Sequence, residues 1–349
     1  MMVNNLKISF IIPAHNAAAC VQRAVQSVLR CMGEQGGFEV VVVENGSTDD
    51  TLQLASGLAA EHEEVVVFRS ETGVSPARNL GVLKARGDWV CFVDADDICR
   101  PEMAKVLPLL VETEPELLVA AYKKGGRIVR SYCRPQNRLL PDDRLEEAKA
   151  WLLSVPTLRM TAWAKFYRRE FLLSNRLFFD ESLSRSEDSE FLLRLLNCCR
   201  KLMFSNLVVY HYNQKSLSTM RSVSPGVSTA YLRAIRKADL AVAESGSAVR
   251  SAFPNYVCGQ MTIVAVHEFY DCAVRVPWRE RNRQMRAFLQ EDVIRKALSS
   301  LTLRRHLLLQ NMPAFFFRRG LLSLGGAICW LRSVYNSRLW LREDAGQQH

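Results

Sequence analysis

A cluster of acidic residues follows an apolar run in the first third of the chain. The segment from residue 89 to residue 103 reads WVCFVDADDICRPEM, so Asp94, Asp96 and Asp97 place three carboxylates within four positions. Like charges this close repel one another, and a buried carboxylate without a partner is costly. We therefore expect a positive group or several hydrogen-bond donors beside this cluster. For Asp97 alone, a second interpretation is the N-cap of a helix near Pro101.

A second acidic pair opens a later amphipathic stretch. In SRSEDSEFLLRLL, Glu187 and Asp188 directly precede apolar residues at helical spacing. A positioned carboxylate can take a proton from a hydroxyl group and so act as a general base. Acidic residues also stabilise the first turn of a helix through its dipole. The pair is thus either catalytic or a helix-stabilising feature.

Four short apolar runs, each able to form a strand, alternate with helical patterns over the first hundred residues. They cover residues 8–12, 40–43, 65–68 and 89–93. This alternation predicts right-handed crossovers and an α/β fold, a Rossmann-like, mainly parallel sheet flanked by helices. Ligands of such sheets bind beyond the carboxyl ends of the strands. The polar motifs PAHN, ENGSTDD and DADD stand at three of these ends, and we expect them to converge on one site.

Four ordered segments resemble one known family. ISFIIPAHNAAACVQRAVQSVL, EVVVVENGSTDDT, GVSPARNLGVLKARGDWVCFVDADD and SEDSEFLLRLL are similar to family 2 glycosyltransferases with the GT-A fold, over about residues 6–215. The resemblance implies inverting transfer of a hexosyl or N-acetylhexosaminyl group from a nucleotide diphosphate sugar, with a UDP-sugar favoured. The acceptor would be a hydroxyl group of a bacterial surface polysaccharide or of a lipid-linked glycan.

The resemblance also implies a divalent metal, Mn²⁺ or Mg²⁺, at the acidic cluster. Asp96 would be a direct ligand, Asp94 would reach the ribose or a metal-bound water, and Asp97 would support the loop. Hard cations prefer oxygen ligands and often bind one or two carboxylates together with phosphate oxygens. Such a cation acts as a Lewis acid on the leaving diphosphate.

Further residues are assigned to the donor through the family's motifs. Pro13 and His15, both in PAHN, are assigned to the nucleotide sugar. His15 stands where an aromatic residue often stacks on the base, and an imidazole can stack too. Glu44 and Asn45 stand where the family usually has two aspartates, which leaves the identity of the base open. The side-chain carbonyl of Asn45 can still accept a hydrogen bond from uracil N3–H. Arg78 would approach the diphosphate, or it is a surface helix residue.

The acceptor side is assigned in the same way. By resemblance, Asp188 would be the general base and Glu187 would help to orient the acceptor or the base. Trp163 and Lys165, in AWAKFYRREFL, belong to the segment that precedes this motif in the family. Both are assigned to the acceptor, and for Trp163 a place in the hydrophobic core is an equal alternative.

The net charge of +10 is concentrated toward the end of the chain. Residues 1–227 carry 28 Lys and Arg against 27 Asp and Glu, whereas residues 228–349 carry 18 against 9. We expect a nucleotide-sugar-binding half at residues 1–100 and an acceptor-binding half at residues 101–221. A mostly helical, basic extension follows at residues 228–349, after a linker near residues 222–228.

The end of this extension resembles an interfacial amphipathic segment. Between residues 311 and 343, aromatic residues and leucines are interspersed with arginines, and the apolar runs are too short to span a bilayer. The segment includes Phe315–Phe317, Leu321, Leu322, Leu324, Ile328, Trp330, Leu331 and Trp340, with Arg318, Arg319, Arg332, Arg338 and Arg342. An anionic membrane surface is the predicted partner. The alternative is packing on the catalytic domain or on a dimer partner.

Composition bears on compartment and on competing functions. Ten cysteines without a CxxC pair are typical of a reducing compartment, and no signal peptide is recognised. We expect a cytoplasmic protein, peripheral on the inner face of the plasma membrane. A nucleic-acid-binding protein is disfavoured because the positive charge is confined to the tail and no binding motif occurs, so no nucleic acid is expected as a partner. A nucleotidyltransferase on a similar sheet would need a Gly-rich phosphate loop where PAHNAAAC stands.

Overall fold

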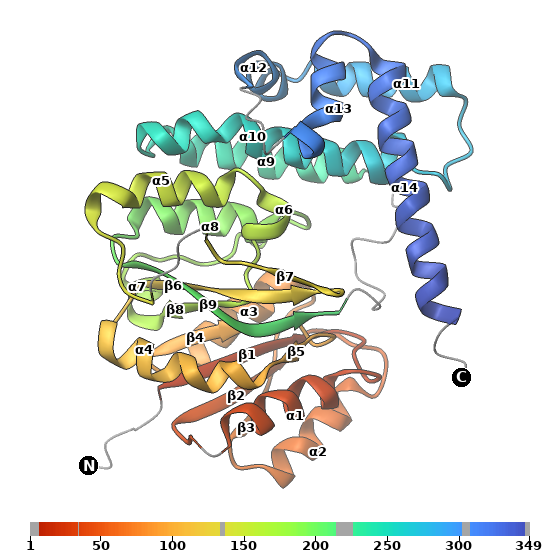
Figure 1. Ribbon diagram of the computed structural model, residues 1–349. Helices are drawn as coiled ribbons and strands as arrows, with labels where there is room; N and C mark the ends of the chain where they lie inside the picture. The colour runs from red at the N-terminus through yellow and green to blue at the C-terminus, as the bar shows by residue number, and fades with distance from the viewer. Residues whose placement is uncertain (1–6, 34, 133–136, 214–225, 302–307, 346–349) are drawn as a thin grey trace. The chain divides into compact units, whose positions relative to one another are not determined.

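The computed structural model describes residues 7–33, 35–132, 137–213, 226–301 and 308–345, with side chains except at 308–310 and 338–345. The chain forms two compact units (Figure 1). Unit 1 comprises Met1–Leu145 and Thr161–Gln214, and unit 2 comprises Glu146–Met160 and Lys215–His349. Of the predicted linker, residues 222–225 lie outside the described part.

The first half of unit 1 is a parallel sheet, as the sequence predicts. Its strand order is β3-β2-β1-β4, and all three pairings are parallel. The strands are β1 (Ile8–Ala14), β2 (Phe38–Glu44), β3 (Val65–Arg69) and β4 (Trp89–Phe92), and the helices are α1 (Val21–Met32), α2 (Thr51–Glu61) and α3 (Val74–Lys84). Alternate residues of β1 face opposite layers, because side chains in a strand alternate between the two faces. Phe10 shares a core with α1, whereas Ile11 lies against Gly81 of α3.

The second half of unit 1 makes the sheet mixed. The order continues β4-β8-β6-β9-β5, with β8 antiparallel to both of its neighbours and β6 parallel to β9. The remaining elements are β5 (Ile98–Cys99), a 3₁₀ helix (Pro101–Lys105), α4 (Val106–Thr113), β6 (Leu117–Lys124), β7 (Arg127–Val129), β8 (Lys165–Arg168), α7 (Arg169–Ser174), α8 (Glu187–Cys198) and β9 (Leu202–Tyr212). The predicted parallel order thus holds for the first four strands, and the later strands add antiparallel pairs.

Unit 2 is helical, as predicted for the basic extension, and it also takes in a segment that precedes β8. Its elements are the end of α5 (Asp142–Leu153), α6 (Pro156–Arg159), α9 (Val227–Ala243), α10 (Ser247–Val264), a π-helix (Ala265–Phe269), α11 (Trp278–Leu289), α12 (Asp292–Ser300), α13 (Leu308–Arg318) and α14 (Leu322–Ala345). No helix of the described residues is long and apolar enough to cross a membrane.

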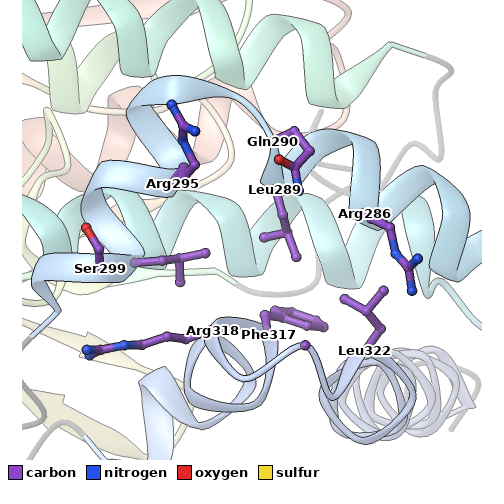
Figure 2. A pocket seen from close by; sticks show the side chains of 10 residues that line it. Arg286, Leu289, Gln290, Arg295, Ser299, Phe317, Arg318 and Leu322 are labelled. Carbon is purple, nitrogen blue, oxygen red and sulfur yellow. The ribbon is translucent and has the colours of Figure 1, made fainter.

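A cavity of about 510 Å³ lies between α11, α12, α13 and the start of α14 (Figure 2). Leu289, Phe317 and Leu322 point into it, and Arg286 and Arg318 lie at its margins. Phe317 is 3% exposed and Leu322 is 6% exposed. These two members of the predicted interfacial segment are therefore buried within unit 2 itself, and packing on the catalytic domain or on a dimer partner stays a prediction. The side chains of Arg338, Trp340 and Arg342 lie outside the described part.

Replacing Gly81 by alanine should destabilise unit 1. A Cβ at this position would lie 2.3 Å from Cγ2 of Ile11, so α3 would have to move away from β1. Overpacking of this kind costs about 1–3 kcal/mol of unfolding free energy, which urea denaturation can measure. Gly57→Ala in α2 is the control, because a Cβ there meets nothing within 4 Å and alanine favours a helix. Equal stabilities of the two variants would contradict this packing.

Candidate active site

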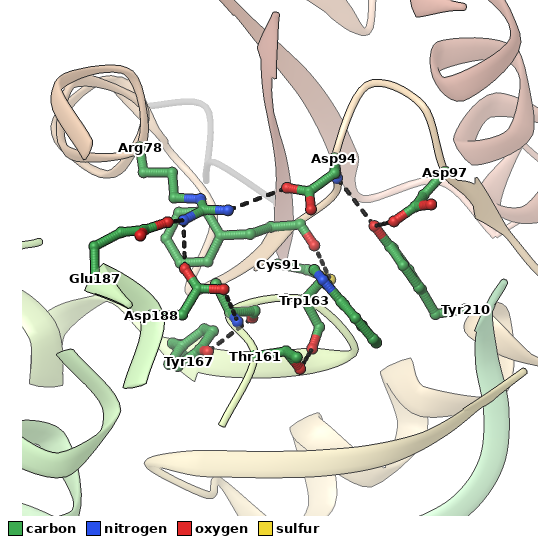
Figure 3. A network of polar contacts seen from close by, with 12 residues as sticks. Arg78, Cys91, Asp94, Asp97, Thr161, Trp163, Tyr167, Glu187, Asp188 and Tyr210 are labelled. Carbon is green, nitrogen blue, oxygen red and sulfur yellow. Dashed lines mark hydrogen bonds and ion pairs between the residues drawn. The ribbon is translucent and has the colours of Figure 1, made fainter. Parts of the chain in front are cut away.

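The acidic cluster lies in a turn directly after β4, and this turn is tied to β9. Asp97 is fully buried, and its carboxylate accepts a hydrogen bond from the Tyr210 hydroxyl (Figure 3) and another from the Asn213 N–H, both at 2.6 Å. The same Tyr210 hydroxyl accepts a 3.0 Å hydrogen bond from the Asp94 N–H. Asp97 therefore holds the turn, as the resemblance implies. The helix-cap alternative is wrong, because the next helix begins at Pro101 with Arg100 as its N-cap.

The geometry of this turn suits a hard cation. Carboxylate oxygens of Asp94, Asp96 and Asp97 lie within 4.8 Å of one another, and the first two residues are half-buried. Burial raises the pKa of Asp94 to about 6 even though Arg78 lowers it, and burial together with the neighbouring aspartates raises the pKa of Asp97. Burial is the main cause of both raised pKa values, and repulsion from the neighbouring aspartates adds to it. A divalent cation bound by Asp94 and Asp96 would supply the missing positive charge.

Arg78 joins the cluster to the second acidic pair. Its side chain is 4% exposed, and Nη2 donates to Asp94 Oδ1 at 3.1 Å. Nη1 donates to Glu187 Oε1 at 3.2 Å and also to Asp188 Oδ1 (Figure 3). One guanidinium group thus connects the turn after β4 with the first turn of α8. The surface alternative for Arg78 is wrong, because the whole side chain is buried.

The acidic pair is held in a fixed orientation at the start of α8. Besides Arg78, Asp188 has a second donor, because its Oδ2 accepts a 3.0 Å hydrogen bond from the Ala162 N–H. Ser186 precedes the helix in the left-handed conformation, with φ of 59°. Burial and the neighbouring Asp188 raise the pKa of Glu187 to about 7. The two carboxylates therefore have different environments. Both oxygens of Asp188 accept hydrogen bonds, whereas Glu187 binds a proton more readily than an ordinary glutamate.

The predicted nucleotide residues gather at the ends of β1 and β2. Glu44 is buried, and although burial opposes its charge, hydrogen bonds from Ser47 and Arg69 lower its pKa. His15 is exposed, and its Nδ1 donates to the backbone oxygen of Asn45 at 3.0 Å. The side-chain Oδ1 of Asn45 is buried without a hydrogen-bond partner in the described structure. Such an unpaired acceptor is costly, so it is suited to a donor supplied by a ligand.

Pro13 takes no part in these contacts. It is buried within β1, where it pairs in register with Val43 of β2. It therefore positions the loop that carries His15.

Trp163 and Lys165 belong to the core of unit 1. The Trp163 ring is 6% exposed and stacks on Tyr210 and Tyr212, with centroid distances of 4.8 and 5.3 Å. Lys165 is 2% exposed, its Nζ donates to Thr161 Oγ1 at 3.2 Å, and burial lowers its pKa to about 7. The structure thus shows a packing role for both residues, as in the core alternative for Trp163, and their contact with an acceptor stays a prediction.

Sequence reasoning missed three contributors to the site. Tyr210 and Asn213 hold the Asp97 carboxylate from β9 and the residue after it, and Ala162 binds Asp188 through its backbone. A backbone donor leaves no signal in the sequence. The tyrosine stands in VVYHYN, a segment with the pattern of a strand, and that pattern does not show which residue its hydroxyl meets.

The family prediction is confirmed by comparison with known proteins. Residues 9–174 match the family described as Glycosyl transferase family 2. This part of the chain is therefore a family 2 glycosyltransferase domain, and solved structures described below share its GT-A fold.

Two curated relatives illustrate the match. The uncharacterized glycosyltransferase EpsJ of Bacillus subtilis is 28% identical over 220 residues, which are 60% of this chain and 62% of EpsJ. TarS of Staphylococcus aureus, a poly(ribitol-phosphate) beta-N-acetylglucosaminyltransferase, is 27% identical over 228 residues, 63% of this chain and 38% of TarS. The chain thus spans less than two thirds of the length of these relatives.

Solved structures extend the likeness to both units. The crystal structure of S. aureus TarS 1-349 in complex with UDP-GlcNAc has a TM-score of 0.66 at 19% identity, covering 93% of this chain and 90% of that chain. The mannosyltransferase PcManGT of Pyrobaculum calidifontis, in complex with GDP-Man and Mn²⁺, has a TM-score of 0.52 at 14% identity, covering 95% and 87%. At these identities the likeness establishes the fold.

The raised pKa of Glu187 predicts a pH-dependent stability. Between its ordinary pKa of 4.5 and its folded pKa of about 7, the folded chain keeps a proton that the unfolded chain has lost. This contribution to stability therefore falls as the pH rises through that interval. In metal-free buffer, Glu187→Gln should make the profile of urea-unfolding free energy against pH less steep there, whereas Glu112→Gln at an exposed position should not. An unchanged slope in Glu187→Gln would contradict the assignment.

Proposed function

We propose that this chain is an inverting glycosyltransferase that uses a divalent metal and a UDP-sugar to glycosylate a hydroxyl group. The observation that carries the proposal is the position of Arg78, whose guanidinium binds Asp94 on one side and Glu187 and Asp188 on the other. It places the carboxylates suited to the donor's metal next to the carboxylates suited to deprotonating an acceptor. An inverting transfer needs both groups around one anomeric carbon.

The donor side is supported by the acidic cluster and by the polar ends of β1 and β2. Asp96 and Asp94 would hold Mn²⁺ or Mg²⁺, which when bound would neutralise the diphosphate as it leaves. The unpaired Oδ1 of Asn45 would accept a hydrogen bond from the uracil N3–H, and exposed His15 would stack on the base. The structures of TarS with UDP-GlcNAc and of PcManGT with Mn²⁺ are consistent with such a donor and metal.

The acceptor step is assigned to the pair at the start of α8. The acceptor hydroxyl attacks the anomeric carbon from the face opposite the diphosphate, and Asp188 takes the hydroxyl proton. The bond between the anomeric carbon and the diphosphate oxygen breaks, and its electron pair leaves with the diphosphate. Hydrogen bonds from Arg78 and the Ala162 N–H hold both oxygens of Asp188, and each oxygen keeps a further lone pair for the proton. Glu187 lies on the same guanidinium and would orient the acceptor.

The proposed acceptor and the proposed cellular location rest on the similarity to known glycosyltransferases and on composition, not on contacts within the site. We assign the acceptor to a surface polysaccharide or a lipid-linked glycan, because TarS is described as acting on poly(ribitol-phosphate). A location on the cytoplasmic side of the membrane is consistent with nine described cysteines that are all free thiols.

Asp96→Ala should abolish the metal-dependent part of UDP-sugar binding, because it removes the proposed direct ligand. Calorimetric titration of UDP-GlcNAc with and without Mn²⁺ measures this effect. Asp88→Ala is the matched control, since Asp88 precedes the amino end of β4, is exposed and pairs with Lys7 on the surface. Unchanged Mn²⁺-dependent affinity in folded Asp96→Ala would refute the metal assignment.

Asp188→Asn should bind the donor normally and lose on the order of 10²-fold or more in turnover, the usual scale for general-base catalysis. Glu187→Gln should lose less, because an orienting residue needs a hydrogen bond rather than a negative charge. Steady-state rates with a hydroxyl acceptor compare the two variants. The opposite order of losses would assign the base to Glu187, and near-wild-type rates in both would place it elsewhere.

A further inference from the structure

Helix α14 packs on the other helices of unit 2 through a face rich in small residues. Its inward face comprises Leu322, Gly325, Gly326, Cys329 and Ser333, all of which are buried. A Cβ at Gly326 would lie 2.3 Å from the Tyr270 ring, so the helix backbone lies close to its neighbour. Leu322 points into the cavity beside α11, which fixes the direction of this face (Figure 2).

Apart from Ser323 at its edge, whose hydroxyl oxygen accepts a hydrogen bond from Asn282, the opposite side of α14 carries apolar residues as far as residue 335. With about 100° of rotation per residue, positions 324 and 331 lie on the far side of the helix from Leu322. We name this side the outer face of α14, and it comprises Leu324, Ala327, Ile328, Leu331, Val334 and Tyr335. Leu324, Leu331 and Tyr335 are 52%, 58% and 63% exposed.

This distribution is the inverse of the usual pattern for a surface helix. Such a helix normally turns its large apolar residues inward and its polar residues to water. Scattered exposed leucines are common, but a continuous apolar face marks an interaction site. The outer face of α14 therefore needs an apolar partner.

Charge decides which partner is favoured. Residues 293–342 contain nine Lys and Arg and no Asp or Glu. Arg318 and Arg319 are exposed just before α14, whereas Arg332 is half-buried and lines a pocket within unit 2. Two copies of this chain that paired through α14 would bring these like charges together. An anionic bilayer attracts them instead, by about 1 kcal/mol for each basic residue near its surface.

We propose that the outer face of α14 inserts into the interfacial region of an anionic lipid bilayer, with the helix lying along the membrane surface. The apolar side chains enter the boundary between headgroups and acyl chains, and the flanking arginines meet lipid phosphates. The proposal narrows the predicted interfacial segment to the outer face of α14. Membrane binding by this face does not depend on the proposed sugar transfer.

Vesicle co-sedimentation tests the proposal with the full chain. The protein should bind vesicles of equal parts phosphatidylcholine and phosphatidylglycerol at low salt, and it should bind pure phosphatidylcholine vesicles much more weakly. Added NaCl should weaken the binding because salt screens charge. Inorganic phosphate at matched ionic strength should weaken it no more than NaCl does, since the target is a lipid surface and not a free anion.

Leu324→Glu with Leu331→Glu should reduce binding by at least about tenfold, because two exposed leucines lose their apolar contact with lipid. The matched control is Leu83→Glu with Leu240→Glu, which changes two leucines that are 54% and 75% exposed outside α14. Circular dichroism and thermal melting check that both variants fold. Equal losses in the two variants would overturn the role of the outer face.

Quenching of tryptophan fluorescence is a second test, and it does not use the glutamate variants. Trp330 lies on α14 and is 38% exposed, whereas Trp278 on α11 is 36% exposed. Lipids with brominated acyl chains should quench the fluorescence of the bound protein, and Trp330→Phe should remove more of this quenching than Trp278→Phe. The proposal is wrong if wild-type protein ignores anionic vesicles, or if it forms a dimer that Leu324→Glu with Leu331→Glu dissociates without any binding to vesicles.

Discussion

The arrangement of the active site depends on the buried guanidinium of Arg78. It is the shared partner of Asp94, in the turn after β4, and of Glu187 and Asp188, at the start of α8 more than 90 positions further along the chain. Removal of one partner from such a buried group leaves charges uncompensated, at a cost of roughly 3–5 kcal/mol. Because Arg78 is on α3, the tight contact of that helix with β1 also sets the position of both acidic groups.

The Arg78 guanidinium is paired with three carboxylates, those of Asp94, Glu187 and Asp188, so negative charge exceeds positive charge among these four residues. Burial and, after it, the neighbouring acidic groups raise the pKa values of Asp94 and Glu187. A donor that arrives with its cation would correct the imbalance on the side of the β4 turn. The protonation state of Glu187 would then respond to occupancy of the site, because the added positive charge lowers the pKa of a nearby carboxyl group.

The sequence allows the strands, the acidic cluster and the family to be predicted, because each leaves a local pattern. Apolar runs identify β1 to β4, and the spacing of Asp94 and Asp96 identifies the cluster. The contact between Arg78 and Asp188 leaves no such pattern, because it joins residues 110 positions apart. The burial of Trp163 and the antiparallel placement of β8 likewise depend on tertiary packing. In the tail, composition indicates an apolar, basic segment but not which face of α14 remains outside.

The path of the chain between the two units limits how the protein can be divided. Residues 146–160 belong to unit 2, although they are preceded and followed by chain that belongs to unit 1. Within unit 2, α6 lies against α10, where a Cβ at Gly259 would come within 2.8 Å of Pro156. A fragment that ends near residue 214 would keep α6 but lose α10, and would expose the apolar surface between them. Unit 1 therefore cannot be separated from unit 2 by a single cut of the chain without dividing the contact between α6 and α10.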